Sequence, residues 1–258
     1  MQNLTPHYRE WLVLVSFVTS VLGAYTALFA MSSITPEMSS RTKWRYATLA
    51  GFALGGVGIW SMHFLGMLAF ELPVLVGYRA LETMVSLIAA VAVSTLALGF
   101  MAAKPFSFGR LLLAGPIAGI AVALMHYIGM FGMRFGGSFE WNAAVVAASI
   151  AIAVVAATAA LWLAFHARRT SHRAAAALVM GAAVCSMHYT GMAGAAFVCS
   201  AGSAGANMAE LLRPDLMLML VLVVSLAVLV LISLNVLHRQ ISAIRMNPAA
   251  APFTSQRG

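Results

Sequence analysis

Seven long runs of apolar residues, each nearly free of charge, set the fold class of this chain. They cover about residues 11–31, 46–69, 83–103, 111–133, 142–166, 174–197 and 216–237. Each run is close to the roughly 20 residues that a helix needs to cross the core of a bilayer. The runs are continuous and rich in Ala, Leu and Val rather than alternating, which favours helices over the strands of a membrane barrel. We therefore expect an all-α integral membrane protein with seven transmembrane helices.

The charged residues predict how these helices are oriented. Only 9% of the 258 residues are charged, and they fall almost entirely between the runs. Eleven of the 15 Lys and Arg residues follow the first, third and fifth runs or lie in the C-terminal tail. Because cytoplasmic loops carry the excess of positive charge, the N-terminus is expected outside and the C-terminus in the cytoplasm. The net charge of +8 then reflects membrane topology, and its scattering along the loops gives no reason to expect a nucleic-acid partner.

Three nearly identical strings divide the chain into repeats. M-H-F-L-G-M occupies residues 62–67, M-H-Y-I-G-M residues 125–130 and M-H-Y-T-G-M residues 187–192. Their histidines, His63, His126 and His188, are 63 and 62 residues apart, which is the length of two spans with their loops. The first six helices are therefore expected to form three two-helix parallel repeats, followed by a seventh helix.

This repeat suggests a division of the chain into three parts. Residues 1–200 are expected to form the six-helix domain, and residues 201–238 an outer loop and the seventh helix. Residues 239–258 contain Pro248, Pro252 and several alanines, and we expect a short, disordered cytoplasmic tail there.

A glycine precedes each repeated histidine by seven residues, at Gly56, Gly119 and Gly181. Seven residues make nearly two helical turns, so each glycine shares a face with its histidine. Small residues allow membrane helices to approach closely. We therefore expect the second, fourth and sixth helices to pack tightly as an inner trio.

The repeated string carries the residue types of a soft metal site. Thioethers favour Cu(I) and imidazole suits copper in both oxidation states. Magnesium and calcium prefer oxygen ligands, and zinc gains little from methionine. The sequence therefore predicts one copper site in the outer half of the membrane. Its candidate metal ligands are His63, His126, His188, Met67, Met130, Met192, Met62, Met125 and Met187.

Other interpretations of these residues stay open at this point. A lone histidine in a membrane helix is ordinarily hydrogen-bonded to a neighbour, and haem held by two histidines is a further alternative. Tyr127 and Tyr189 either orient the site or serve as interfacial aromatics. Cys185 is either a copper ligand or, as we favour, a buried structural thiol. No catalytic constellation emerges, so no enzymatic activity is expected from this chain.

The repeated string resembles the MHYT domain, a bacterial integral membrane sensor family named after this motif. The resemblance covers about residues 9–200, and residues 187–190 match the name letter for letter. The second copy departs at Ile128 and the first at Phe64 and Leu65. The resemblance implies a multi-pass protein of the bacterial inner membrane, with copper held by the Met and His residues near its outer face. It also implies detection of a diatomic gas such as O2, CO or NO.

We therefore expect a copper-binding membrane sensor module that detects a diatomic gas, or the state of copper or redox, and signals to a cytoplasmic partner. The alternative is a copper transport or delivery protein that assists a metalloenzyme complex. In either case membrane lipid surrounds the helices.

Overall fold

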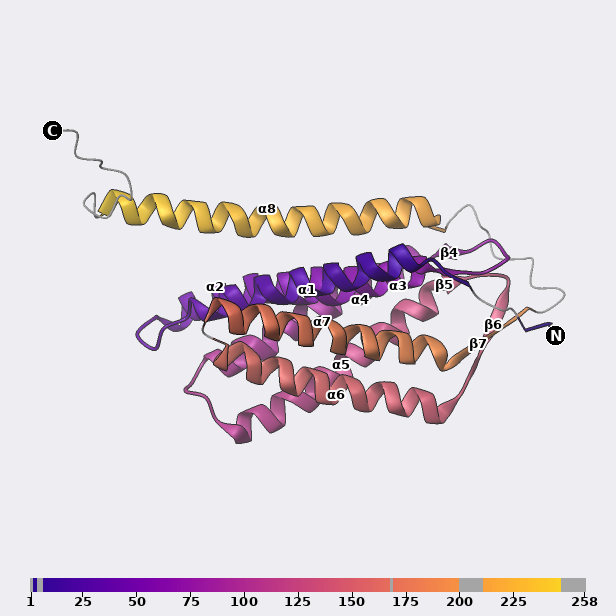
Figure 1. Ribbon diagram of the computed structural model, residues 1–258, viewed down its shortest axis with the longest axis horizontal. Coiled ribbons are helices and arrows are strands. Elements are labelled where there is room, and N and C mark those ends of the chain that lie inside the picture. Colours follow the sequence, from indigo (N-terminus) through magenta and orange to yellow (C-terminus); the bar gives the residue numbers. More distant parts are fainter. Residues whose placement is uncertain (1, 4–6, 168, 200–210, 247–258) are drawn as a thin grey trace.

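Long helices that run side by side make up most of the computed structural model, which describes residues 2–3, 7–167, 169–199 and 211–246 (Figure 1). The single-segment helices are α1 (Glu10–Ser32), α4 (Ala80–Ala102), α5 (Phe108–Gly132), α6 (Ala143–His166), α7 (Thr170–Ala193) and α8 (Pro214–Met246). A further continuous helix consists of α2 (Ser40–Gly51), the π-helix η1 (Phe52–Ser61) and α3 (Met62–Ala69). Within the described residues, seven helices are long and apolar enough to cross a membrane, as the sequence predicts.

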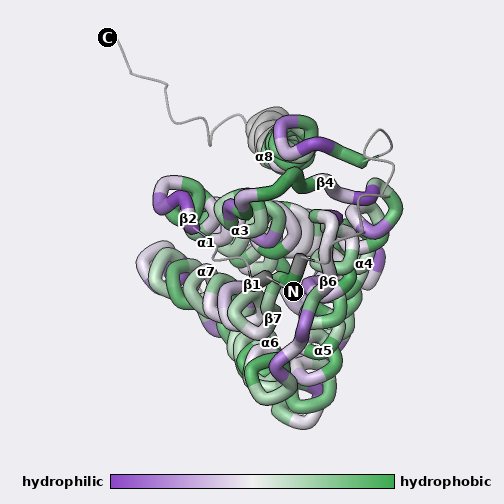
Figure 2. The backbone as a smooth tube through the Cα atoms, turned by 90° about the vertical axis from the view of Figure 1, so that its right-hand side faces the viewer, coloured by the Kyte–Doolittle hydropathy of each residue, from purple (hydrophilic) through white to green (hydrophobic). Residues whose placement is uncertain are grey.

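The first six of these spans form a closed ring in chain order. Contacts join α1 to η1, η1 to α4, α4 to α5, α5 to α6, α6 to α7 and α7 back to α1. Seen from one end, these helices surround a common axis, and α8 lies outside them (Figure 2). It contacts the second span through η1 and α3. The seventh span is therefore a peripheral helix attached to one member of the ring.

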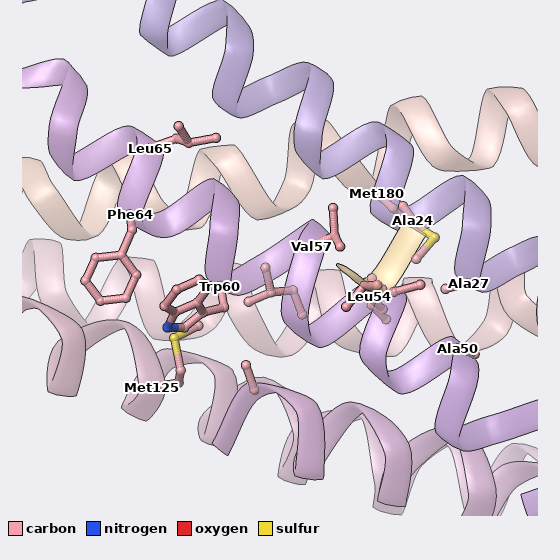
Figure 3. Packing of buried hydrophobic residues seen from close by; sticks show 14 of the residues in the cluster. Ala24, Ala27, Ala50, Leu54, Val57, Trp60, Phe64, Leu65, Met125 and Met180 are labelled. Carbon is pink, nitrogen blue, oxygen red and sulfur yellow. The ribbon is translucent and has the colours of Figure 1, made fainter. Parts of the chain in front are cut away.

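The spans that carry the repeated string are the more buried members of the ring. The apolar window of Ser40–Ala69 is 83% buried inside the protein, against 44% for α5 and 50% for α7. The corresponding values for α1, α4 and α6 are 39%, 33% and 17%. Buried side chains of the second span, among them Leu54, Val57, Trp60 and Phe64, fill the space between it and its neighbours (Figure 3).

The role predicted for the glycines seven residues before each histidine is wrong. They allow neighbouring helices of the ring to pack closely, and they do not lie between the three helices of the expected inner trio. A Cβ atom at Gly119 would lie 2.7 Å from the carbonyl oxygen of Ala153 on α6. One at Gly181 would lie 2.6 Å from the side chain of Val21 on α1. The residues just before them, Ala118 and Met180, line the interior instead, so the glycines themselves turn toward the adjacent helix.

In the second span the π-helix changes which glycine packs against the neighbouring helix, and the predicted Gly56 does not. A Cβ atom there would make only ordinary contacts, at 3.7 Å or more, whereas one at Gly55 would clash with the backbone of Ala90 on α4. The contact at Gly55 corresponds to those of Gly119 and Gly181. Hydrogen bonds in a π-helix span five residues rather than four. The wider turns of η1 therefore accommodate one residue more between the glycine and the histidine than the sequence spacing predicted.

Short strands close the end of the bundle that carries the N-terminus, and we call this the strand end (Figure 1). In one antiparallel sheet β7 (Ala195–Cys199) lies between β1 (Gln2–Asn3) and β6 (Gly137–Trp141). Two further pairs join β2 (His7–Tyr8) to β3 (Phe70–Glu71) and β4 (Gly77–Tyr78) to β5 (Met133–Arg134). These strands correct the all-α expectation. They also shorten the run predicted at 174–197, because residues 195–199 hydrogen-bond to β6 instead of continuing α7.

The seventh helix is longer than predicted. α8 continues to Met246, past residue 238 where we expected the tail to begin. No proline interrupts the sequence between Pro214 and Pro248, so the chain can stay helical after its apolar part ends. The remainder of the predicted tail and most of the predicted outer loop lie outside the described residues.

Candidate metal centre

The three repeated histidines meet at one point inside the ring. His63 on α3, His126 on α5 and His188 on α7 are each at most 1% exposed. Their Nδ1 atoms lie 3.0, 3.1 and 3.3 Å apart. Each histidine stands five or six residues before its helix ends at the strand end, which is about 7.5–9 Å along the helix axis. The residues that the repeat brings to one depth therefore also meet laterally, and we call them the histidine triad.

A glycine from another copy of the string lies against Nε2 of each imidazole, the ring nitrogen that does not face the other two histidines. A Cβ atom at any of these glycines would come well within 3.0 Å of Nε2, closer than real Cβ atoms approach. Gly66 faces His188, Gly129 faces His63 and Gly191 faces His126. The contacts run cyclically from copy to copy, so the glycine of the repeated string is needed to make room for the triad.

Protons alone cannot satisfy the nitrogens of the triad. A neutral imidazole has one N–H and one lone pair, so an Nδ1 atom that donates cannot also accept. Three mutually facing Nδ1 atoms therefore cannot form a closed ring of hydrogen bonds. If the protons sit on Nε2, three lone pairs converge at the axis, and the buried Nε2 atoms have no hydrogen-bond partner among the described residues. A cation at the axis would turn this repulsive arrangement into a favourable one.

The dimensions of the triad fit a small metal ion. The point equidistant from three nitrogens with sides of 3.0 to 3.3 Å lies about 1.8 Å from each. Bonds from imidazole to a metal such as zinc are about 2.0–2.1 Å, so an outward shift of about 0.2–0.3 Å per ring is enough. Among the described residues, this is the one group of three or more His, Cys, Asp or Glu side chains placed to hold a metal. The same short distances leave no room for a haem between two of the histidines.

The six methionines of the repeated string are all buried, at most 2% exposed, but they do not share one environment. Met67 lines a cavity at the strand end, and Met187 lines an apolar cavity on the other side of the triad. The side chain of Met125 is directed toward the indole of Trp60 (Figure 3). The other three are Met62, Met130 and Met192. Their role as metal ligands stays a prediction.

Cys185 lies apart from the triad. It is a free, half-buried cysteine that is not part of the group of converging side chains. Among the described residues its neighbours include the hydroxyl of Ser16. This environment favours the structural thiol that we preferred from the sequence over a copper ligand.

Three serines that sequence analysis did not connect form a second layer around the triad. Each donates to the carbonyl three residues before it, at 2.7 to 2.8 Å, and faces a polar aromatic group of a motif-bearing span. The pairs are Ser16 with Tyr189 at 3.0 Å, Ser149 with Tyr127, and Ser86 with the indole N–H of Trp60 at 3.1 Å. The tyrosine rings also pack edge-on against His126 and His188. These contacts favour the orienting role that the sequence left open for the two tyrosines over a purely interfacial one.

Trp60 compensates for the missing tyrosine in the first copy. Phe64 occupies the tyrosine position and packs edge-on against His63, but it has no hydroxyl. The indole of Trp60, one turn earlier, donates to Ser86 instead. The hydrogen bond between neighbouring spans is thus present in all three copies, although the donor residue differs.

We expect Ser149→Ala to loosen this second layer without dismantling it. The change removes the partner of the Tyr127 hydroxyl, and hydrogen bonds between membrane helices are worth about 0.6 kcal/mol on average, up to about 1.7. Reversible unfolding in mixed detergent micelles measures the loss. Ser186→Ala is the control, because that exposed hydroxyl bonds only to the carbonyl of Ala182 in its own helix. Equal stability losses in the two variants would contradict the proposed layer.

A polar contact inside the membrane-spanning region links the triad to α8. The hydroxyl of Ser225 on α8 donates to that of Ser61, at 3.0 Å. Ser61 is fully buried, donates to the carbonyl of Gly56 at 2.9 Å and stands two residues before His63. A shift of His63 would therefore take place two residues from the one polar contact described between α8 and the ring.

The strand end covers the triad with buried aromatic side chains. Tyr8 on β2 packs edge-on against Tyr189 and Phe70, and Tyr78 on β4 packs against Phe64. Burial raises the pKa of Tyr8 to about 12 and that of Tyr78 further. Both hydroxyls therefore stay neutral, and they bring no charge to the cover of the triad.

The fold and the triad define a multi-pass membrane protein with a buried three-histidine centre near one end of its helical ring. Residues 56–114 and 119–177 match the MHYT model, which is described as a bacterial signalling protein N-terminal repeat. The chain belongs to the MHYT family. Each matched unit begins in a motif-bearing span, includes the whole of the helix that follows and ends in the first part of the next motif-bearing span. The serine contacts of the first two copies join the motif-bearing span at the start of each unit to the helix that follows it.

Similar proteins are longer bacterial signalling proteins. Over 199 residues the chain is 41% identical to the bifunctional diguanylate cyclase/cyclic di-GMP phosphodiesterase MucR of Pseudomonas aeruginosa, covering 75% of this chain and 29% of MucR. It is 36% identical over 211 residues to the cyclic di-GMP phosphodiesterase NbdA of the same organism, covering 79% and 26%. It is 29% identical over 198 residues to the signaling protein YkoW of Bacillus subtilis, covering 74% and 24%. The chain thus spans less than a third of these relatives, and no solved structure matches it.

Proposed function

We propose that this chain is a membrane sensor module that holds copper at His63, His126 and His188 and responds to a diatomic gas or to redox state. The observation that carries the proposal is the convergence of three buried Nδ1 atoms within 3.3 Å of one another. Imidazole suits copper in both oxidation states. When bound, copper would supply a redox-active centre with affinity for O2, CO or NO.

The protein around the triad supports this role in three ways. The glycines of the repeated string fix the outer edges of the rings, and the serine layer fixes the tyrosines beside them. Burial excludes water from the imidazoles. The methionines of the string would add soft thioether ligands that favour Cu(I). The chain itself is proposed to lack enzymatic activity.

We propose that the strand end faces the periplasm and that the chain lies in the bacterial inner membrane. All four arginines of the strand end are paired with carboxylates there: Arg9 with Glu71, Arg79 and Arg134 with Glu82, and Arg213 with Asp215. The strand end holds only these four of the 15 Lys and Arg residues, and the excess lies at the opposite end or in the C-terminal part of the chain. This distribution supports an outside N-terminus and a cytoplasmic C-terminus. The triad would then lie about 7.5–9 Å inside the periplasmic ends of its helices.

We propose that α8 carries the signal to a cytoplasmic signalling partner. It is attached to the second span near the triad through Ser225 and Ser61 and reaches beyond its apolar part toward the cytoplasm. The names of MucR and NbdA describe synthesis or breakdown of cyclic di-GMP. A cyclic di-GMP system is accordingly the first class of output to examine.

Copper delivery to a metalloenzyme complex is the second candidate. The cavity at the strand end, which reaches Met67 from the side that we assign to the periplasm, favours it. Passage of the ion through the bundle is disfavoured, because the apolar cavity on the inward side of the triad has one hydroxyl, that of Ser94, among its lining side chains. A charged ion in such surroundings is costly.

The test of the sensor proposal is the response of the purified chain to gas. We expect one copper per chain by elemental analysis, and an infrared band of bound CO after reduction. Protein without copper, or reduced copper protein that ignores CO, NO and O2, would overturn it. Loss of oxidase activity in a deletion strain, with no change in cyclic di-GMP when gas is supplied, would favour delivery instead.

A further inference from the structure

A largely interior cavity lies within the ring, directly inward of the triad. Its rim is formed by Ile59, Val122 and Val184, each four residues, or about one helical turn, before a repeated histidine. Its far end is formed by Leu28, Leu98 and Leu161 from the three other helices of the ring. All six ring spans contribute to its wall. We call this space the axial chamber.

The axial chamber is apolar and large enough for a small molecule. Its volume is about 60 Å³, several times the ~10–15 Å³ that one water needs. A buried water also requires two to four polar partners, and Ser94 supplies the one hydroxyl among the lining side chains. Cavities of this kind stay dry and accept apolar molecules or xenon.

The wall between the axial chamber and the lipid is thin between α4 and α5. A groove on the outside of these two helices shares Val93, Ala97 and Ala118 with the chamber. Its outer rim includes Leu96 and Ile117, which are 59% and 60% exposed and face the region of the acyl chains. Two alanines and a valine thus separate the chamber from the bilayer, and no charged side chain among the described residues lines either space.

We propose that the axial chamber binds a small apolar gas, which enters from the bilayer between α4 and α5 and is held one helical turn from the triad. Apolar gases concentrate in the hydrocarbon core, so this route avoids both the strand end and its ion pairs. The proposal rests on the proposed function in one respect, that gas bound in the chamber is the molecule that the sensor detects. Binding of gas in the chamber itself requires no copper. An occupied chamber contacts Ile59 and Leu54 of η1, in the span that carries His63 and touches α8.

Xenon tests the chamber because it is apolar and does not react with copper. We expect xenon-pressurised crystals of the purified chain to show xenon inside the ring, and xenon NMR in nanodiscs to show saturable exchange, with and without copper. Ala160→Leu projects a larger side chain into the chamber and should weaken xenon binding at least about tenfold. Ala159→Leu, which adds the same group on the exposed side of α6, should leave binding unchanged. Ala27→Leu repeats the test from α1, should Ala160→Leu fail to fold.

The outcomes separate the chamber from the copper site. No xenon in the wild-type chamber, or equal binding by Ala160→Leu and Ala159→Leu, overturns the proposal. If the chain binds copper but no xenon, the proposal of a gas-binding chamber alone is overturned. Xenon without copper supports the chamber and overturns the proposed copper function.

Discussion

Replacing His126 with alanine is expected to lower the affinity of the chain for copper by more than about 100-fold. Loss of an outer-shell partner of a metal ligand typically costs 10–100-fold, and His126 supplies one of three direct donors, with Nδ1 atoms 3.0 and 3.3 Å from the other two. Two imidazoles remain, and no described carboxylate or cysteine is placed to replace the third. Competition with a Cu(I) chelator in detergent measures the affinity.

The same variant should lose the stabilisation that copper gives to the folded chain. A ligand at 100 times its Kd stabilises the native state by about 2.7 kcal/mol, so the wild type should unfold at higher temperature with copper than without it. His126→Ala should unfold at the same temperature in both conditions. The copper-free variant should lose less than the usual ~2–5 kcal/mol of a large-to-small core change, because it also removes a buried, unsatisfied imidazole.

His172→Ala is the matched control for the histidine variant. His172 stands on α7, the helix that carries His188, but it is exposed and lies at the opposite end of the bundle. Its removal should change neither the copper content nor the copper-dependent shift in unfolding temperature. Copper bound in full by His126→Ala, or lost equally by both variants, would show that the triad is not the metal centre.

The convergence of the three histidines was predictable from the sequence because similar strings that recur after every two spans are expected at one depth. The strings stand at spacings of 63 and 62 residues, and a ring closed in chain order brings their histidines together. The direction of each methionine was not predictable, since it depends on how the spans tilt against their neighbours. The strings alone gave no basis for separating Met67 from Met187, which line cavities on different sides of the triad.

The serine layer was missed because its members share no local string. Ser16, Ser86 and Ser149 stand in the helix that precedes or follows a repeated string, at spacings of 70 and 63 residues. In the first copy the donor is Trp60 rather than a tyrosine, and Trp60 stands two residues before the string. The recurrence exists in space and in hydrogen bonds, and comparison of letters at equal positions does not detect it.

The number of spans followed from composition, but their internal geometry did not. Counting seven residues back from a histidine assumes α-helical turns throughout, and the π-helix Phe52–Ser61 breaks this assumption in one span out of three. The two-residue strands are too short to show alternation, and their partners are as distant in the sequence as Gln2 and Cys199. Such pairings depend on the assembled ring, which holds the ends of its helices side by side.

Gly129→Ala is expected to damage the triad more than its single added methyl group would suggest. The new Cβ would come well within 3.0 Å of Nε2 of His63, and His63 cannot retreat because its Nδ1 already lies 3.0 and 3.1 Å from the other two. Overpacking of this kind typically costs 1–3 kcal/mol, which corresponds to a fall in unfolding temperature of about 2–4 °C per kcal/mol for a chain of this size. Displacement of His63 should also weaken copper binding, measured with the same chelator.

Gly109→Ala separates this clash from the general effect of alanine in a helix. Gly109 belongs to the same helix, α5, but a Cβ there would meet only the hydroxyl of Ser107, at 3.8 Å. The added methyl group should therefore be neutral or stabilise the chain by about 0.4–1 kcal/mol, through the lower entropy of the unfolded state. Two variants with the same chemical change in one helix should thus differ in stability, with Gly129→Ala the less stable of the two. Equal unfolding temperatures and equal copper affinities would mean that Gly129 does not seat His63, and the cyclic contact between glycines and histidines would have to be abandoned.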